Sequence, residues 1–386
     1  MTRMSTLIRA GEAAAILGVT KPSLYAYVSR GRLTRTKAAD GRTSLFARDE
    51  VEQLAARARH APTGPRPTID VHVSSTITTI DETAVRYRGF DLATLAADHG
   101  FEEVAELLWS ATGADIGSST VWPGCAADDV AAVANLSGLG LTPAATIAVA
   151  AQVLATRHPE DRSVEAARRL LLATPVVLGS ARRTGRYAAR LAGVWRRRPT
   201  SELVDAVDTA LLLLADHELA TSTLAVRLAA SVRAGPYPSF AAGLATVEGT
   251  LHGAASAAAH RLLADCERNG PEPVIAGLLG ERRSVAGFGH SIYRGVDPRF
   301  PVLLDRVRRL DPERAAVVDA VVAAAGRAMA PQPNVDLALG ALTWLGGLDP
   351  DVPIFAVARI VGWGAHHEEE TDERPVRFRG VSTPVR

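Results

Sequence analysis

The chain has 386 residues, which is long enough for more than one domain. Hydrophobic residues make up 47% of it and charged residues 22%, ordinary proportions for a soluble globular protein, and the net charge of +1 gives no sign that the chain as a whole binds nucleic acid or a membrane. Two cysteines, Cys125 and Cys266, are too few for a disulfide framework or a cysteine zinc site, so we expect free thiols in a reducing cytoplasm.

Charge is distributed unevenly along the chain. Residues 1–60 contain eleven Arg or Lys against five Asp or Glu, a net charge of +6, so the remaining residues carry −5. An asymmetry of this kind predicts a basic module attached to a separate body. Aromatic residues are few and alanine is abundant, which favours closely packed helices in that body.

The basic module, residues 1–59, has two short helical patterns around Gly18-Val19-Thr20. Thr20 is a natural N-cap, and Pro22 falls in the first turn of a second helix expected over residues 21–30. The following residues predict a strand, a tight turn at Asp40-Gly41, a second strand and a helix. This order resembles the winged helix-turn-helix of the MerR and excisionase group.

The resemblance implies that this module binds DNA. Its expected contacts come from the second helix and from the wing: Lys21, Ser23, Tyr25, Arg32, Arg35, Lys37 and Arg42. The alternative is a small helical protein-interaction domain whose charges are simply solvated.

Residues 60–68, with three prolines and a glycine, predict a linker, and residues 69–386 form the body. Most of the body has apolar residues at helical spacing, while "SSTITTID" (74–81) predicts a strand. Residues 130–156 carry no formal charge, but polar residues and glycines interrupt them. Thr142-Pro143 predicts the start of a buried helix there, so we expect no membrane-spanning segment.

Four short segments of the body contain side chains capable of catalysis. They are His217 in "ADHELAT", His252 in "TLHGAA", His290 in "GFGHSIYRGVDPRF" and Asp336 in "PNVDLALG". Glycines beside two of these histidines allow a ligand to approach closely. Each segment alone is weak, since a lone histidine is usually structural and an aspartate at a helix start is usually a cap.

The order and spacing of the four segments resemble the citrate synthase family. The resemblance covers about 300 residues, from "STITTIDETAVRYRGF" to "ERPVRFRG". It implies a mainly α, two-domain citrate synthase fold behind the winged helix-turn-helix, with a small domain inserted at about residues 254–345. It also implies that His252, His290 and Asp336 are the catalytic residues.

Further site residues follow from the same resemblance. Those expected to bind oxaloacetate are His217, Arg299, Arg359 and Arg374, the last reaching the site of the neighbouring subunit in a homodimer. The backbone expected to line the CoA pocket is Val285, Ala286, Gly287, Phe288 and Gly289. The resemblance implies short acyl-CoA and oxaloacetate as substrates, with no metal and no further cofactor.

Three functions remain open on the sequence alone. The chain is a citrate synthase, a 2-methylcitrate synthase using propionyl-CoA, or a DNA-binding regulator that uses the enzyme-like body to sense a metabolite. Thr250, Leu219 and Ala220 depart from the residues usual in the family and bear on substrate choice. Adjacent His366 and His367 do not face one metal, and with the three glutamates that follow they predict a solvated helix end.

Overall fold

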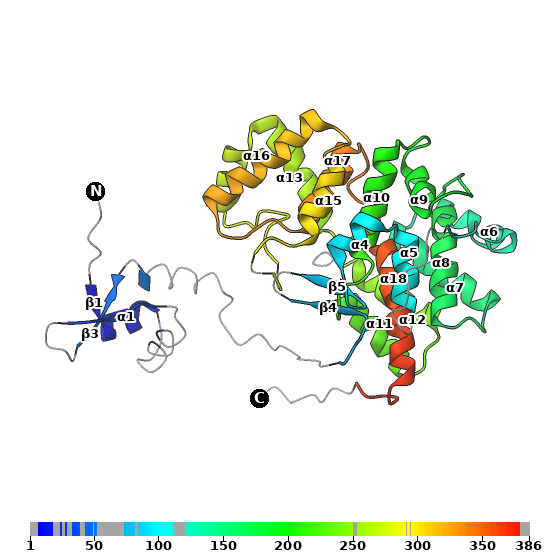
Figure 1. Cartoon of the computed structure of the whole chain (residues 1–386), viewed down its shortest axis with the longest axis horizontal. Coiled ribbons are helices and arrows are strands. Elements are labelled where there is room, and N and C mark those ends of the chain that lie inside the picture. Colours follow the sequence, from blue (N-terminus) through cyan, green and yellow to red (C-terminus); the bar gives the residue numbers. More distant parts are fainter. Residues whose placement is uncertain are drawn as a thin grey trace. The chain divides into compact units, whose positions relative to one another are not determined.

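The computed structural model describes residues 7–17, 24, 28, 33–38, 43–48, 50–51, 73–81, 84–110, 121–249, 253–290, 292–293 and 295–378. The chain separates into two compact units, residues 1–73 and 74–386 (Figure 1). Each unit has its own group of buried apolar residues, so each is described by itself.

The first unit contains a small sheet and a helix. Its described elements are β1 (Leu7–Arg9), α1 (Ala10–Leu17), β2 (Thr36–Lys37) and β3 (Ser44–Ala47). Both outer strands pair antiparallel with β3, with Thr36 opposite Leu45 and Ile8 opposite Phe46. The two strands expected for the wing are therefore confirmed, whereas β1 was not predicted and the Asp40-Gly41 turn lies outside the described residues.

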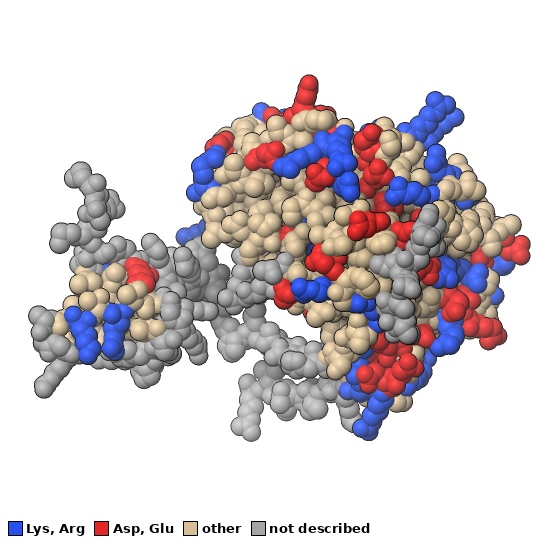
Figure 2. Space-filling view, in the orientation of Figure 1, with Lys and Arg blue, Asp and Glu red and all other residues tan. Residues whose placement is uncertain are grey.

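The core of the first unit brings together residues from all its parts. Ile8, Leu24, Phe46 and Val51 are all buried. Leu24 belongs to the segment expected to form the second helix, most of which lies outside the described residues. Basic side chains lie on the described surface of this unit (Figure 2), and Arg35 and Lys37 are both exposed.

The second unit is mainly helical. It begins with a small antiparallel sheet of β4 (Thr78–Ile80), β5 (Val85–Tyr87) and β6 (Phe90–Asp91). The helices are α4 (Leu92–Asp98), α5 (Phe101–Trp109), α6 (Ala127–Val133), the 3-10 helix η1 (Ala134–Leu139), α7 (Pro143–Arg157), α8 (Ser163–Val177), α9 (Tyr187–Trp195), α10 (Ser201–Leu214), α11 (Thr221–Ser231), α12 (Pro236–Val247), α13 (Ala255–Asn269), α14 (Pro271–Gly280), α15 (Arg299–Val307), α16 (Pro312–Ala328), α17 (Val335–Leu345) and α18 (Ile354–Asp372). None of the helices in the described part of the chain is long and apolar enough to cross a membrane.

Several helix starts follow from local sequence. The hydroxyl of Thr142 accepts a hydrogen bond from the Ala145 N–H and Pro143 follows at the first helical position, as predicted. The helical pattern of residues 92–109 is divided into α4 and α5 at His99-Gly100, because the Glu103 carboxylate accepts from the Gly100 N–H and starts a new helix.

Helix α18 is the centre of the second unit (Figure 1). It packs against α5, α8, α10, α11 and α12, and Trp363 near its middle is fully buried. A separate group of helices, from α13 to α17, contains the tight pair α13 and α17. At that crossing a Cβ atom on Gly340 would lie 2.6 Å from the His260 backbone nitrogen, so only glycine allows the two helices to approach this closely.

Gly340→Ala should therefore destabilise the second unit. The added methyl group must push α13 and α17 apart, and overpacking of this kind costs about 1–3 kcal/mol. Gly326→Ala in α16 is the matched control, since no described atom lies within 4 Å of its Cβ position. Thermal unfolding should show a lower midpoint for Gly340→Ala and an unchanged or higher one for Gly326→Ala; equal midpoints would contradict the packing argument.

Candidate active site

A cavity of about 450 Å³ lies where α15, α17, α18 and two loops meet. The first loop joins α10 to α11 and carries His217. The second precedes α15 and carries His290. The cavity is lined by His217, Glu218, Leu219, Ala220, Thr221, His290, Ile292, Arg299, Val335, Asp336, Phe355 and Arg359. Five residues expected to be catalytic or to bind substrate therefore share one cavity, although they are up to 142 positions apart in the chain.

Backbone pairing between two segments brings His290 and Asp336 together. The Asn334 N–H donates to the Gly287 carbonyl (2.9 Å) and the Gly289 N–H donates to the Gln332 carbonyl (2.8 Å). The Asn334 side chain then caps α17 by accepting from the Asp336 N–H (3.0 Å), while its amide donates to the Gly289 carbonyl (2.6 Å). Asn334, not Asp336, is thus the helix cap, which leaves the Asp336 carboxylate available for chemistry.

The two glycines before His290 are required by this pairing. Gly287 and Gly289 have φ angles of +80° and +83°, a region that favours glycine. A Cβ atom on Gly287 would also lie 2.7 Å from the Leu337 Cβ at the start of α17. The "GFG" segment therefore allows the loop to lie directly against α17.

The His290 ring presents a proton to the cavity. Its Nδ1 accepts the Ile292 backbone N–H at 3.1 Å. A neutral ring whose Nδ1 accepts must carry its proton on Nε2. Burial and the nearby Arg299 lower the pKa of His290, which favours this neutral form.

His217 is held in a sharp turn beside His290. Its ring lies 5.4 Å from the His290 ring, centroid to centroid, and its Nε2 lies 3.0 Å from the Tyr293 hydroxyl. The next residue, Glu218, has a φ of +50°, which is uncommon outside glycine and marks strain at the cavity wall. Burial, with Arg299 and Arg359 nearby, lowers the pKa of His217 well below its ordinary value.

Asp336 is half-buried against the same cavity. Burial raises the pKa of its carboxyl to about 6, because desolvation disfavours the charged form more than the nearby Arg299 favours it. A carboxylate with a pKa near the working pH is suited to accept a proton during a reaction and to release it afterwards.

The two arginines of the cavity differ in their partners. Arg299 is buried and makes a bidentate pair with Asp297, with contacts of 3.0 and 2.8 Å. Asp297 also accepts the Val335 N–H (3.1 Å), so this pair fixes the start of α17. Arg359 is only 1% exposed, and among the described residues its Nε and Nη1 have no hydrogen-bond partner.

An unpaired buried guanidinium is costly unless a ligand completes it. Arg359 lines the cavity with its charged end 4.9 Å from the Phe355 ring centre. Burial lowers the pKa of Arg359, because removal from water disfavours its charged form. The cavity is therefore suited to an anionic ligand that could accept hydrogen bonds from Arg359.

A second cavity, of about 590 Å³, lies beside the segment expected to bind CoA. Ala286 lines it together with Arg261, Asp265 and Arg283 from α13 and the loop after α14. Val285 is buried, and Phe288 forms a β-bridge with Pro333. The segment 285–289 thus lies between a basic cavity and the start of α17.

Other predicted site residues are placed differently or lie outside the described residues. His252 lies outside them, as do Lys21, Ser23, Tyr25, Arg32 and Arg42 of the first unit. Arg374 is exposed and does not line the cavity of its own chain. The sequence reasoning missed Asp297, Tyr293 and Phe355; an acid two residues before an expected anion-binding arginine was the signal that could have identified Asp297.

The prediction of a solvated helix end at His366-His367 is wrong. Both histidines and Glu370 are buried, because α18 is covered by neighbouring helices on nearly every side. His367 bonds to the Ser163 hydroxyl (2.8 Å) and the Ala234 carbonyl (3.1 Å), while His366 faces Asp216 and Arg227. Charged residues at a helix end are not solvated when they pair inside the protein.

Comparison with known proteins identifies the families that the two parts of the chain resemble. Residues 70–379 match the family model described as citrate synthase, C-terminal domain, and residues 7–59 match one described as a helix-turn-helix domain. Citrate synthase of Haloferax volcanii is 28% identical over 343 residues, covering 77% of this chain and 89% of that protein. The 2-methylcitrate synthase of Mycobacterium tuberculosis is 27% identical over 318 residues, covering 74% and 81%.

Solved structures share the fold. A ternary complex of citrate synthase from Thermoplasma acidophilum with carboxymethyl coenzyme A and oxaloacetate has a TM-score of 0.69 at 22% identity, covering 82% of this chain and 95% of that one. The citrate synthase of Pyrobaculum aerophilum has a TM-score of 0.67 at 22% identity, covering 81% and 89%.

The second unit is thus an acyltransferase of the type that converts an acyl into an alkyl group on transfer, behind a helix-turn-helix domain. The chain belongs to the citrate synthase family, and the mainly α fold expected from the sequence is confirmed.

Substitution of the two buried arginines should have opposite effects on stability. Arg359→Met removes a buried guanidinium whose Nε and Nη1 have no described hydrogen-bond partner, so relief of its desolvation should outweigh its attraction to Asp216 and leave the thermal midpoint unchanged or raise it. Arg299→Met leaves Asp297 buried without its partner, which costs about 3–5 kcal/mol, and should lower the midpoint strongly. Thermal unfolding without ligand measures the midpoint of each variant. An equal fall of the midpoint in the two variants would show that Arg359 is paired in the free protein.

Proposed function

We propose that the protein is a citrate synthase, which condenses acetyl-CoA with oxaloacetate and hydrolyses the thioester to give citrate and CoA. The observation that carries the proposal is the single cavity in which a buried, unpaired guanidinium, two histidines of lowered pKa and a carboxyl with a pKa of about 6 converge. An anion site beside a proton acceptor and a proton donor is what this condensation requires.

In this proposal Asp336 removes a proton from the acetyl methyl group, a role typically worth about 10²- to 10⁴-fold in rate. The thioester oxygen gains negative charge as the proton leaves, and His252 stabilises it as a hydrogen-bond donor. The resulting enol attacks the ketone of oxaloacetate. His290, with its proton on Nε2, polarises that ketone and then protonates the new alkoxide.

Oxaloacetate is held by its carboxylates and its keto group. Arg359 supplies Nε and Nη1, the two nitrogens that lack a described partner, and Arg299 adds a guanidinium held by its pair with Asp297. His217 donates from the turn after α10. Arg374 is exposed on its own chain, and we propose that it completes the site of a neighbouring subunit in a homodimer.

The acyl-CoA binds along residues 285–289, where the second cavity offers Arg261 and Arg283 to the phosphates of CoA. Residues of about 254–345, which include α13 to α17, form a small domain that closes over CoA. Closure excludes water until condensation is complete. No metal and no further cofactor takes part, and the protein acts in the cytoplasm.

Two alternatives are separated by simple assays. A 2-methylcitrate synthase would prefer propionyl-CoA, and one methylene is worth only about 1–3 kcal/mol of discrimination. A DNA-binding regulator would bind the metabolite without turnover. The retained carboxylate with a raised pKa favours an enzyme, because a sensor has no need of a proton acceptor.

We also infer that residues 1–59 bind DNA, mainly through phosphate contacts. The support is the match to a helix-turn-helix domain, the local charge of +6 and the exposed Arg35 and Lys37 at the wing. Phosphate contacts carry little sequence information and make affinity fall steeply with added salt.

Release of CoA from acetyl-CoA should require oxaloacetate and should depend on pH through Asp336. The base acts in its ionised form, so kcat/KM should fall about tenfold per pH unit below about pH 6. Burial lowers the pKa values of His217 and His290, which favours their neutral forms. A thiol-release assay from pH 5 to 8 measures this pH dependence of kcat/KM.

Asp336→Asn should remove most of the activity, by about 10²-fold or more, while oxaloacetate still binds. Near-normal turnover in Asp336→Asn, or a flat profile down to pH 5, would show that another group is the base. Absence of turnover with acetyl-CoA and propionyl-CoA alike would favour the regulator.

Mixing two inactive variants should test whether Arg374 crosses between subunits. If it does, dimers formed from Arg374→Ala and Asp336→Ala subunits contain one site with both residues intact. Activity should then recover toward half that of the intact enzyme in the mixed dimers after dissociation and reassociation. Mixtures that stay inactive, or sedimentation of a fully active monomer, would remove this role.

Deletion of residues 1–68 should abolish DNA binding and leave turnover within a few-fold of the intact protein. All the proposed catalytic residues lie in the second unit, which is compact by itself. Gel retardation at low and moderate salt measures the first effect and thiol release the second. Collapse of activity in a truncated protein that remains folded would make the first unit part of the enzyme.

A further inference from the structure

The turn that carries His217 rests on a carboxylate that the proposed mechanism does not use. Asp216 is fully buried directly behind the cavity wall. Its Oδ2 accepts the Glu218 N–H at 3.0 Å, which closes the turn around His217. The Tyr87 hydroxyl donates to the Asp216 carbonyl (2.9 Å), so the backbone of the turn is held from the other side as well.

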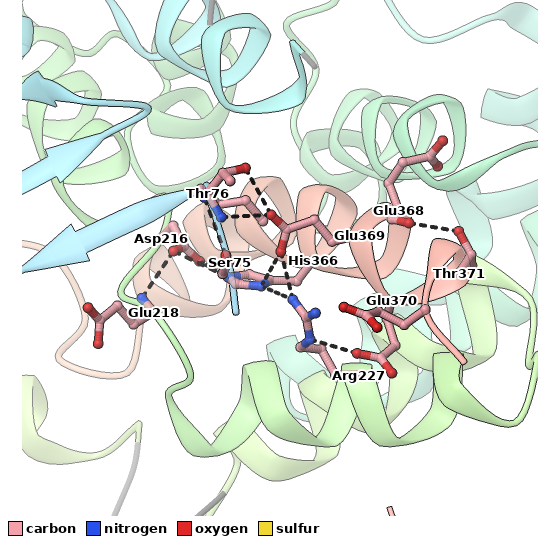
Figure 3. A network of polar contacts seen from close by, with 12 residues as sticks. Ser75, Thr76, Asp216, Glu218, Arg227, His366, Glu368, Glu369, Glu370 and Thr371 are labelled. Carbon is pink, nitrogen blue, oxygen red and sulfur yellow. Dashed lines mark hydrogen bonds and ion pairs between the residues drawn. The ribbon is translucent and has the colours of Figure 1, made fainter. Parts of the chain in front are cut away.

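His366 contacts this carboxylate from α18 (Figure 3). Its Nε2 lies 3.3 and 3.4 Å from the two oxygens of Asp216. Its Nδ1 lies 2.8 Å from Nη1 of Arg227. An arginine has only donors, so Nδ1 accepts and the ring proton is on Nε2, directed at Asp216. The direction of both hydrogen bonds is therefore fixed.

Arg227 is itself held firmly in the interior. It is fully buried and pairs with Glu369 and Glu370, each at 2.9 Å (Figure 3). Glu370 in turn makes a bidentate contact with Arg377, at 2.8 and 2.6 Å. Arg377 lies three residues after Arg374, so the chain of contacts runs from the C-terminal segment to the turn of His217.

The spacing on α18 explains how the helix reaches the turn. Arg359, Gly362 and His366 lie at positions i, i+3 and i+7, on one face of the helix. Gly362 donates its N–H to the Ala215 carbonyl (3.0 Å), and a Cβ atom there would lie 2.3 Å from the Asp216 carboxylate. One helix face thus presents Arg359 to the cavity and His366 to the back of the cavity wall.

We propose that Asp216, His366 and Arg227 form a positioning relay that fixes the orientation of His217 toward oxaloacetate and ties it to the C-terminal segment. The three are positioning residues, since none of them lines the cavity. Burial alone would raise the pKa of Asp216, but His366 and Arg359 hold it below its ordinary value, so the relay contains a carboxylate. The inference rests on the proposed function in that oxaloacetate is the ligand.

A pair of variants at His366 tests the relay in the intact chain. In His366→Gln the longer amide can accept from Arg227 and donate to Asp216. In His366→Asn the shorter amide reaches only the position of Nδ1, so the bond to Arg227 survives and the link to Asp216 is lost. Displacement of a binding group by about 1 Å can cost up to about 10²-fold. We expect the Kd for oxaloacetate, measured by calorimetry, to rise tenfold or more in His366→Asn and less than threefold in His366→Gln.

The same substitutions at His367 provide the control. His367 is buried on the same helix and makes two hydrogen bonds, but its partners are Ser163 and Ala234 rather than the turn. His367→Asn should lower the thermal midpoint about as much as His366→Asn, yet leave the Kd within threefold. Equal losses of affinity at the two positions, or equal Kd values for His366→Asn and His366→Gln, would overturn the relay.

Ring nitrogen NMR of ¹⁵N-histidine protein keeps this test separate from the proposed function. The His217 signals should shift in His366→Asn and stay in place in His366→Gln and His367→Asn. If the intact protein binds no oxaloacetate, the proposed function fails, while the His217 signals still decide the relay. Unchanged His217 signals in His366→Asn would overturn it whatever the ligand.

Discussion

The pairing of residues 287–289 with residues 332–334 is the constraint on which the site depends. Two backbone hydrogen bonds and the Asn334 side chain join a loop to the start of α17. Asp297 strengthens the same junction by accepting the Val335 N–H while holding Arg299. His290 and Asp336 are 46 positions apart in the sequence, and this junction brings them into one cavity.

Burial acts in the same direction on four titratable groups of the cavity. It raises the pKa of Asp336 and lowers the pKa values of His217, His290 and Arg359, so each group is pushed toward its neutral form. This desolvation is costly for Arg359, because two of its nitrogens have no hydrogen-bond partner among the described residues. A bound dicarboxylate would offset that cost by pairing with the buried guanidinium. The buried charge that lowers the stability of the free protein is therefore also the group that favours an anionic ligand.

The helical fold could be predicted from the sequence because it depends on local apolar periodicity, whereas the residues of the cavity were expected only from the resemblance to a family. Helical periodicity indicated that most of the body is helical, and Thr142-Pro143 marked the start of α7. The pairing of Asn334 with Gly289 and the unpaired nitrogens of Arg359 could not be predicted, because they depend on contacts between distant segments. For the same reason His366 and His367 resembled a solvated helix end, although other helices bury them.

The misread end of α18 shows how one helix serves two purposes. Arg359, Gly362 and His366 are spaced three and four residues apart, so they lie on the same face of the helix. That face meets the turn of Asp216 and His217. A charged helix face normally points to solvent, so a pattern alone favours exposure. Here His366 has partners on other elements, Asp216 and Arg227, and burying such paired groups contributes less to stability than to orientation. Asp216 and Arg227 lie more than 130 residues earlier in the chain than His366. Their contacts with it explain why a histidine at the end of a helix can influence a histidine in the cavity.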